Sequence, residues 1–242
     1  MEWTEALKAA ARAAGADLVG VAGLEPFRNE GAIPLPDSER FANAVSLAVR
    51  LDDDIIDGLG EGPTPAYARH YRAVNAALDG ITNRLLRWVV SQGFSGCAIP
   101  ASQVVDTERL LGSLSHKAVA RLAGIGWQGK SLLIVSPQYG PRIRLATLLT
   151  DMPLRADQPL KNRCGTCKQC AAACPAMAIK NVRTASRYAN RDEALYFSRC
   201  VAQTLSFKSR PDINAQICGV CVRVCPFGRK APKRRAGRET SD

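Results

Sequence analysis

Apolar residues recur along the first part of the chain with the spacing of amphipathic helices. From Glu2 to Ala14, Ala and Leu recur every three or four positions and Gly15 follows, which predicts a helix with a glycine stop. Residues 63 to 92 predict a much longer helix, and a shorter one is expected over residues 115 to 122. The apolar stripe of the long helix consists of Val74, Leu78, Ile81, Leu85 and Val89.

Short apolar runs between these helices predict strands at residues 17–22, 44–51, 94–99, 132–135 and 143–150. Gly140 and Pro141 lie between the last two runs and favour a turn, so we expect those two strands to form a β-hairpin. Because helices and strands alternate, this part of the chain is expected to be a mixed α/β domain.

The cysteines change this picture. The chain has 242 residues and nine cysteines, of which eight lie between Cys164 and Cys225. The start of the chain is acidic and lacks the basic residues and the hydrophobic stretch of a secretory signal. No apolar run is long enough to cross a bilayer. We therefore expect a cytoplasmic protein without a membrane anchor, in which cysteines bind metal rather than form disulfides.

The eight clustered cysteines have the spacing of a two-cluster ferredoxin. In such proteins three closely spaced cysteines hold one [4Fe–4S] cluster, and the cysteine before a proline holds the other. The first cluster is thus assigned Cys164, Cys167, Cys170 and Cys225. The second cluster is assigned Cys174, Cys200, Cys218 and Cys221, with Cys200 as the fourth ligand that the second run lacks.

Structural zinc is the alternative for the Cys-x2-Cys pairs, but the full run with its following prolines is not a usual zinc spacing. The ninth cysteine, Cys97, lies alone in an apolar setting and is expected to be a packing residue. The sequence therefore predicts two [4Fe–4S] clusters close together, arranged as an electron relay.

Three segments follow from these patterns. Residues 1–155 are expected to form a cofactor and substrate domain, and residues 156–230 a ferredoxin-like double [4Fe–4S] domain. Residues 231–242 are a basic tail that contributes to a formal net charge of +11. A solvated, disordered tail is the favoured interpretation, and docking to nucleic acid or to an acidic partner protein is the alternative.

The stretch from Ala123 to Lys130, the following apolar run, Tyr139-Gly-Pro and residues 148–154 resemble the epoxyqueuosine reductase family. The position of Cys200 between the two cysteine runs fits the same family. The resemblance implies a cobalamin-binding, nitroreductase-like α/β domain joined to a double-cluster ferredoxin domain, an overall α+β architecture that reductive dehalogenases share. It also implies that the clusters pass electrons to a cobalt corrinoid.

Candidate site residues lie on both sides of this stretch. Gly126 and Gly129 allow close backbone approach to a bulky ligand, Trp127 offers a flat apolar face, and Lys130 offers a positive charge, so we expect these four to bind the cofactor. A dinucleotide site is rejected, because the glycines follow a helix rather than a strand. A tight structural turn remains the alternative.

Three further residues are candidates for proton handling and cofactor binding. Asp106 is the nearest acid of the kind that the resembled family uses as proton donor, and a turn or helix cap is the alternative. His116 is a proton donor candidate, with a buried, carbonyl-bonded histidine as the alternative. Lys117 is expected at the cofactor, and His70 is assigned a surface role.

Two classes of function remain at this stage. The first is a reductase in which cobalamin reduces a small or nucleoside-like substrate, with electrons from a donor such as a ferredoxin or flavodoxin. The second is a non-catalytic electron carrier that reactivates a corrinoid protein. tRNA is a third, weaker partner, suggested by the positive charge.

Overall fold

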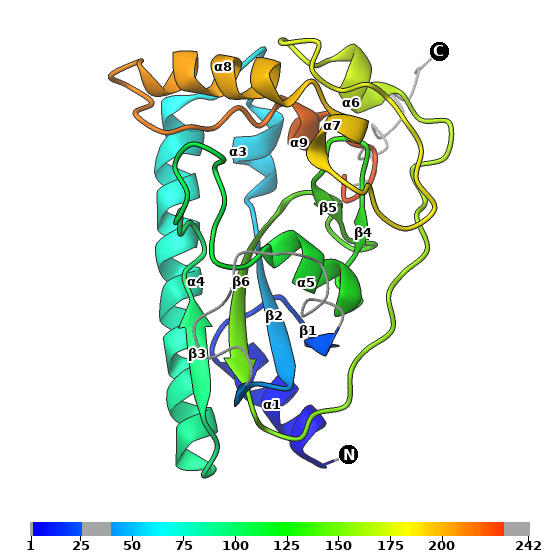
Figure 1. Ribbon diagram of the computed structural model, residues 1–242. Helices are drawn as coiled ribbons and strands as arrows, with labels where there is room; N and C mark the ends of the chain where they lie inside the picture. Colours follow the sequence, from blue (N-terminus) through cyan, green and yellow to red (C-terminus); the bar gives the residue numbers. More distant parts are fainter. Residues whose placement is uncertain (1, 26–39, 230–242) are drawn as a thin grey trace, which may run out of the picture.

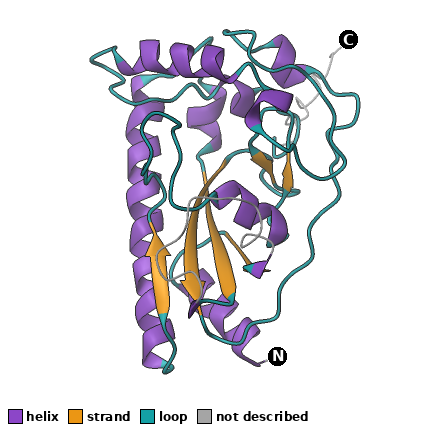
Figure 2. Cartoon of the chain, in the orientation of Figure 1, coloured by secondary structure: helices purple, strands orange, loops and turns teal. Residues whose placement is uncertain are grey.

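The computed structural model describes residues 2–25 and 40–229, so the basic tail lies outside the described residues. The chain forms a mixed α/β body followed by a cysteine-rich module with short helices (Figures 1 and 2). The strands are β1 Leu18–Gly23, β2 Asn43–Arg50, β3 Gly96–Ile99, β4 Trp127–Gln128, β5 Ile134–Val135 and β6 Ile143–Thr150. The helices are α1 Glu2–Ala13, α3 Asp53–Asp57, α4 Pro65–Ser91, α5 His116–Leu122, α6 Gln169–Ala172, α7 Arg191–Ala194, α8 Phe197–Lys208 and α9 Val220–Arg223.

The main sheet has the order β1-β2-β6-β3, and every neighbouring pair is antiparallel. It lies between two helical layers, with α1 and α4 on one face and α5 on the other (Figure 1). β2 alternates between these layers, because Val45 and Leu47 belong to the core under α4 whereas Ala44 and Ala48 belong to the core under α5. Both faces are buried, which explains the continuous apolar runs in the sequence.

The long helix forms as its sequence predicts. Thr64 caps its N-terminus by accepting a hydrogen bond from the Tyr67 N–H, and Pro65 occupies the first turn. All five residues of the predicted apolar stripe are buried. The α4 stripe therefore covers one face of the sheet and builds the larger core.

The predicted hairpin between residues 132–135 and 143–150 is wrong. β5 pairs with β4 in a separate two-stranded ribbon, whereas β6 pairs with β2 and β3 in the main sheet. The physical reason is burial: β6 is apolar enough to occupy the middle of a sheet covered on both sides, and an edge hairpin would leave one of its faces exposed. The turn itself is real, since Ser136 and Gly140 exchange backbone hydrogen bonds across it.

The cysteine module shares a core with the body. Ile213, Ile217 and Val222 pack in the same apolar cluster as Leu59 and Tyr67. The α/β body and the iron–sulfur module are thus in direct contact through buried side chains. Among residues 2–25 and 40–229, none of the helices has both the length and the apolar character that crossing a bilayer requires.

The segment between the two parts, residues 151–162, is extended and bonded along its length. Asp157 accepts hydrogen bonds from Lys8 Nζ at 2.6 Å and from the Val21 N–H at 2.8 Å. The backbone N–H of Arg155 donates to Thr4 Oγ1 at 2.8 Å. This segment therefore runs as a strap against α1 and β1.

Candidate functional site: two cysteine groups and a neighbouring cavity

The first cysteine group brings Cys225 to three cysteines that precede it by 55 or more positions. Cys164, Cys167, Cys170 and Cys225 all line one small cavity. Burial raises the pKa of the Cys170 thiol, and the nearby Cys164 and Cys167 raise it further. Burial likewise raises the pKa of Cys225 to about 11, and its cysteine neighbours are the other three members of this group.

The second group forms around α8 and α9. Burial raises the pKa of Cys200, and Cys174 is the cysteine that adds to this effect. Cys218 has a pKa raised by burial and by Cys200 and Cys174. The pKa of the Cys221 thiol is raised by burial first, then by Cys218 and then by Cys170 of the first group.

The two groups fit two cubane clusters. Each contains four thiols. The first group includes Cys225 from the second cysteine run, and the second group includes Cys174 from the first run, which is the interleaving that two-cluster ferredoxins show. Burial and mutual repulsion disfavour the thiolate form of these cysteines, so the arrangement favours a cationic metal centre as their partner. Within the described residues, no three metal-binding side chains converge around a single ion position. The ligand assignment itself stays a prediction.

Hydrogen-bond donors point at the sulfurs. The Ala178 N–H donates to Cys174 Sγ at 3.3 Å, and the Trp127 indole N–H donates to Cys164 Sγ at 3.4 Å. Such donors tune the reduction potential of an iron–sulfur cluster.

The ribbon β4–β5 separates the first cysteine group from a larger cavity. Strand alternation directs Trp127 toward the first group and Gln128 toward the large cavity. In the same way Val135 lines the small cavity of the first group and Ile134 lines the large one. The ribbon is therefore a wall between the two spaces.

The structure places four predicted cofactor residues on the cluster side of this wall. Trp127 is fully buried, and Lys130 donates from Nζ to the Cys167 carbonyl at 2.7 Å and to Asn181 Oδ1 at 2.8 Å. A side chain at Gly129 would approach Cys164 Sγ, and one at Gly126 would clash with the Val135 carbonyl at 2.4 Å. The glycines thus allow the ribbon to close against the first group. Binding of a further cofactor by these four stays a prediction.

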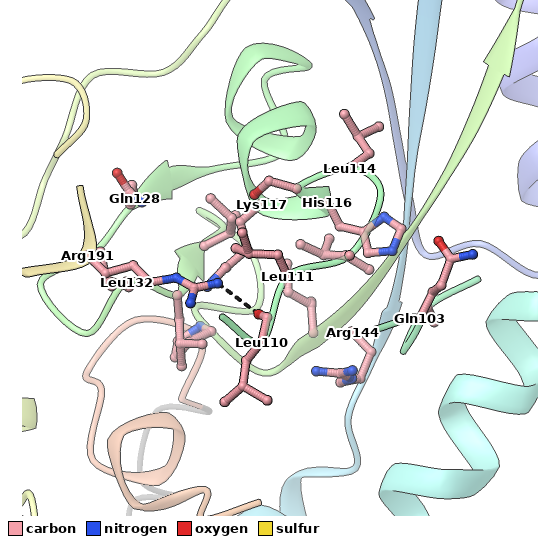
Figure 3. A pocket seen from close by; sticks show the side chains of 18 of the residues that line it. Gln103, Leu110, Leu111, Leu114, His116, Lys117, Gln128, Leu132, Arg144 and Arg191 are labelled. Carbon is pink, nitrogen blue, oxygen red and sulfur yellow. Dashed lines mark hydrogen bonds between the residues drawn. The ribbon is translucent and has the colours of Figure 1, made fainter. Parts of the chain in front are cut away.

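The large cavity has a volume of about 460 Å³ and lies between α5, β6, the loop 101–114 and residues 188–191 (Figure 3). Its apolar wall includes Leu110, Leu111, Leu132 and Ile134. The cationic side chains that line it are Lys117, Arg144 and Arg191. This combination suits a ligand with an apolar body and negative or carbonyl groups.

Lys117 is the link between this cavity and the second cysteine group. Burial lowers the pKa of Lys117 to about 8, Arg191 and Arg144 lower it too, and Cys200 and Cys221 act in the opposite direction. The side chain therefore lies within electrostatic reach of two second-group thiols while lining the cavity. Among the predicted cofactor residues, Lys117 is the one that the structure places here.

His116 also lines the cavity, but both of its ring nitrogens are engaged. Nε2 lies 3.0 Å from the Pro100 carbonyl, which can only accept, so this nitrogen carries the proton. Nδ1 then accepts from the Thr147 hydroxyl at 2.8 Å. Burial lowers the pKa of His116, and the neutral ring ties the loop after β3 to β6. Its predicted role as a proton donor is untested.

Asp106 is not among the residues that line the cavity. Its carboxylate accepts a hydrogen bond from the Arg109 N–H at 2.8 Å, and its backbone pairs with Leu111. This is the turn role that the sequence offered as the alternative. The catalytic role of Asp106 stays a prediction.

Sequence reasoning missed two arginines of the cavity. Arg144 donates to Asn75 Oδ1 at 2.9 Å and to the Tyr71 hydroxyl at 3.1 Å, and it stacks on the Tyr71 ring. Arg191 donates to the carbonyls of Arg109 and Leu110 at 2.6 and 2.9 Å, so it fastens the cavity loop to the cysteine module. In the sequence, only the alternation of side chains along β6 could have placed Arg144 at the cavity. No sequence pattern indicated a place there for Arg191.

Comparisons with known proteins agree with this arrangement. Residues 163–228 match the family described as 4Fe-4S double cluster binding domain. The chain is 34% identical to epoxyqueuosine reductase of Listeria monocytogenes over 128 residues, which cover 52% of this chain and 32% of that protein. It is 30% identical to epoxyqueuosine reductase of a Synechococcus strain over 203 residues, covering 81% of this chain and 58% of the relative.

Solved structures show the same fold. A catabolic reductive dehalogenase in complex with 3-bromo-4-hydroxybenzoic acid matches 93% of this chain with a TM-score of 0.74 and 20% identity, over 32% of its own chain. An epoxyqueuosine reductase with a modified tRNA stem loop matches 94% of this chain with a TM-score of 0.60 and 21% identity, over 65% of its own chain. The chain spans about a third of the first curated relatives that it matches.

Proposed function

We propose that this chain, which is epoxyqueuosine reductase-like in sequence and fold, is an iron–sulfur oxidoreductase that delivers electrons to a substrate in the large cavity. The observation that supports the proposal is the large cavity beside the cysteine module, where Lys117 lies within electrostatic reach of Cys200 and Cys221 and Tyr188 within reach of Cys164 and Cys170. Electrons held by the two groups would therefore be close to the ligand space. A carrier protein without its own substrate has no need of such a cavity.

Cobalamin is the cofactor that we propose for this domain, by analogy with the resembled family. The residues present fit part of it: the apolar wall of the cavity would pack against the corrin, and Lys117, Arg144 and Arg191 would offer donors for its amide and phosphate groups. A bound cobalamin supplies a strongly reducing cobalt centre. The finer architecture is proposed with it, as a nitroreductase-like domain over residues 1–155 and a cluster domain over residues 156–230.

The substrate class that we propose is a modified nucleoside. One solved neighbour is an epoxyqueuosine reductase bound to an epoxyqueuosine-modified tRNA stem loop. In this chain the loop 101–114 forms one side of the cavity, and Arg191 holds it in place. These residues would position a modified base in the cavity and exclude water from it.

The proposal is tested by metal content. The protein is expressed anaerobically with cobalamin supplied, and iron, sulfide and cobalt are measured together with visible and EPR spectra. We expect about eight irons per chain and stoichiometric cobalt with a Co(II) signal. Eight irons without cobalt would leave the cluster assignment standing, remove cobalamin and favour the alternative of an electron carrier for a corrinoid protein.

A cavity-filling variant locates the cofactor. Leu111→Trp places a large ring in the cavity, and Val90→Trp places the same ring on the exposed face of α4, where Val90 is 56% exposed. We expect Leu111→Trp to lose cobalt while it retains its iron, and Val90→Trp to keep both. Equal cobalt in the two variants would show that the cofactor lies elsewhere.

A further inference from the structure

The surface around the first cysteine group carries charge of one sign. From Gln158 to Arg191 the sequence has no Asp or Glu. Its cationic residues are Lys161, Arg163, Lys168, Lys180, Arg183, Arg187 and Arg191. Seven cationic residues in a segment that contains no acidic residue favour an attractive field for an anionic partner.

Four of these cations form what we call the cationic face, namely Lys161, Arg163, Lys168 and Arg183, and all four are exposed. They flank the loop that holds Cys164. A recess of about 260 Å³ reaches from Arg183 to the first group, since Arg183, Gly165 and Cys164 all line it. A side chain built at Gly165 would meet nothing within 4 Å, so the loop over the first group faces open space.

The position of this face within the relay decides its partner. Of the described residues that line the recess at Cys164, none also lines the large cavity. The first group can thus be reached from a side other than the ligand space, although Tyr188 of the cavity wall lies within electrostatic reach of Cys164 and Cys170. A macromolecule that binds here is placed to supply electrons rather than to present a substrate.

We propose that the cationic face is the docking surface for a small acidic electron-transfer protein of the flavodoxin or ferredoxin kind. This inference rests on the proposed function and adds the site of electron input. With flavodoxin, the anionic hydroquinone loses one electron to become the neutral semiquinone, and the first cluster goes from [4Fe–4S]²⁺ to [4Fe–4S]⁺. No bond breaks and no proton moves in this step.

The experiment uses the holoprotein with both clusters and flavodoxin hydroquinone as the probe. Cluster reduction is followed by stopped-flow absorbance in the wild type and in the triple variant Lys161→Glu, Lys168→Glu, Arg183→Glu. The matched control carries the same charge change at exposed arginines elsewhere, as Arg12→Glu, Arg40→Glu and Arg87→Glu. Reduction by dithionite, which needs no docking, is measured in parallel.

We expect the second-order rate constant with flavodoxin to fall at least tenfold in the cationic-face variant at low salt, and to change much less in the control. The wild-type rate should decrease steeply with added salt. Equal rates in the two triple variants overturn the proposal. So does a cationic-face variant that keeps its flavodoxin rate but loses binding of a tRNA stem loop, because the surface then serves nucleic acid.

The dithionite control distinguishes a wrong docking surface from a wrong proposed function. If dithionite reduces both clusters in every variant, by one electron each, the relay is intact and a failed docking test concerns the surface alone. If dithionite reduction itself fails, the proposed function is at fault.

Discussion

The indole N–H of Trp127 donates a hydrogen bond to the sulfur of Cys164 at 3.4 Å, and this pair joins the β4–β5 ribbon to the first cysteine group. Trp127 is fully buried, and its ring packs edge-on against Phe227 with the centroids 4.9 Å apart. A donor to a cluster thiolate stabilises the more negative, reduced state most. We therefore expect Trp127 to tune the reduction potential of the predicted first cluster.

Trp127→Phe should shift the potential of the first cluster to more negative values. The variant keeps an aromatic ring against Phe227 but removes the donor. A hydrogen bond worth about 1 kcal/mol corresponds to roughly 40 mV for a one-electron couple. EPR-monitored redox titration measures both clusters in one sample, and the second cluster should keep its potential. A parallel shift of both clusters would instead indicate a general disturbance of the module.

Cys200→Ser should remove one cluster and leave the other. Cys200 lies on α8 and neighbours Cys174 of the second group, so its loss deprives that cluster of a ligand. Iron content should drop from about eight to about four per chain, and the remaining EPR signal should be that of the first cluster. Cys97→Ser, in β3 and outside both groups, is the control and should keep all of its iron. Full iron in Cys200→Ser would refute the ligand assignment.

Arg142→Met should destabilise the fold strongly. The Arg142 side chain is fully buried and pairs with Asp53 at 3.1 Å and with Asp57 at 2.5 Å. Asp53 is itself buried, and losing a partner from a buried ion pair costs about 3–5 kcal/mol. Chemical denaturation of the holoprotein measures the free energy of unfolding. Arg210→Met breaks the exposed pair with Asp212 and should leave that free energy unchanged, so equal effects of the two variants would contradict the argument.

Protonation of His116 should lower the free energy of unfolding in mild acid. Burial lowers its pKa in the folded state below the ordinary 6.5, and the positive charge of Arg144 acts in the same direction. The unfolded chain therefore binds the proton first as the pH falls below about 6.5, which favours unfolding until the folded-state pKa is reached. Urea midpoints measured from pH 7.5 to 5 should decline in the wild type. The decline should be smaller in His116→Asn, and equal slopes would exclude His116 as the cause.

The sequence predicted the elements whose pattern is local. The α4 stripe and the bounds of β6 follow from apolar periodicity, and the clustering of the cysteines follows from their spacing. The partner of β6 did not follow, because strand pairing depends on which apolar faces meet in three dimensions. β5 lies within the predicted strand 132–135, but its partner β4 was missed because it has two residues, too few for an alternation to show.

At the site, the glycine-rich stretch from Ala123 to Lys130 is another place where the sequence pattern does not give the tertiary placement. Its residue types indicated close approach to a bulky ligand, and the structure does bring Gly129 and Trp127 against a bulky group, the first cysteine group. Which side of the ribbon each residue faces depends on the alternation of β4, which the sequence alone did not reveal. Arg191 entered the cavity from the cysteine module, far along the chain, and only the tertiary fold could bring it there.

The strap of residues 151–162 has a consequence for speed. Asp157 and Arg155 are bonded to α1 and β1, and Ile213 and Val222 share a core with Tyr67, so we expect no hinge motion between the two halves of the protein. If the chain transfers electrons as proposed, the separation between the electron donor side and the ligand space should then be constant from one turnover to the next. Internal electron transfer should be ungated, and the length of each cycle should be set by encounters at the surface and by exchange of the ligand.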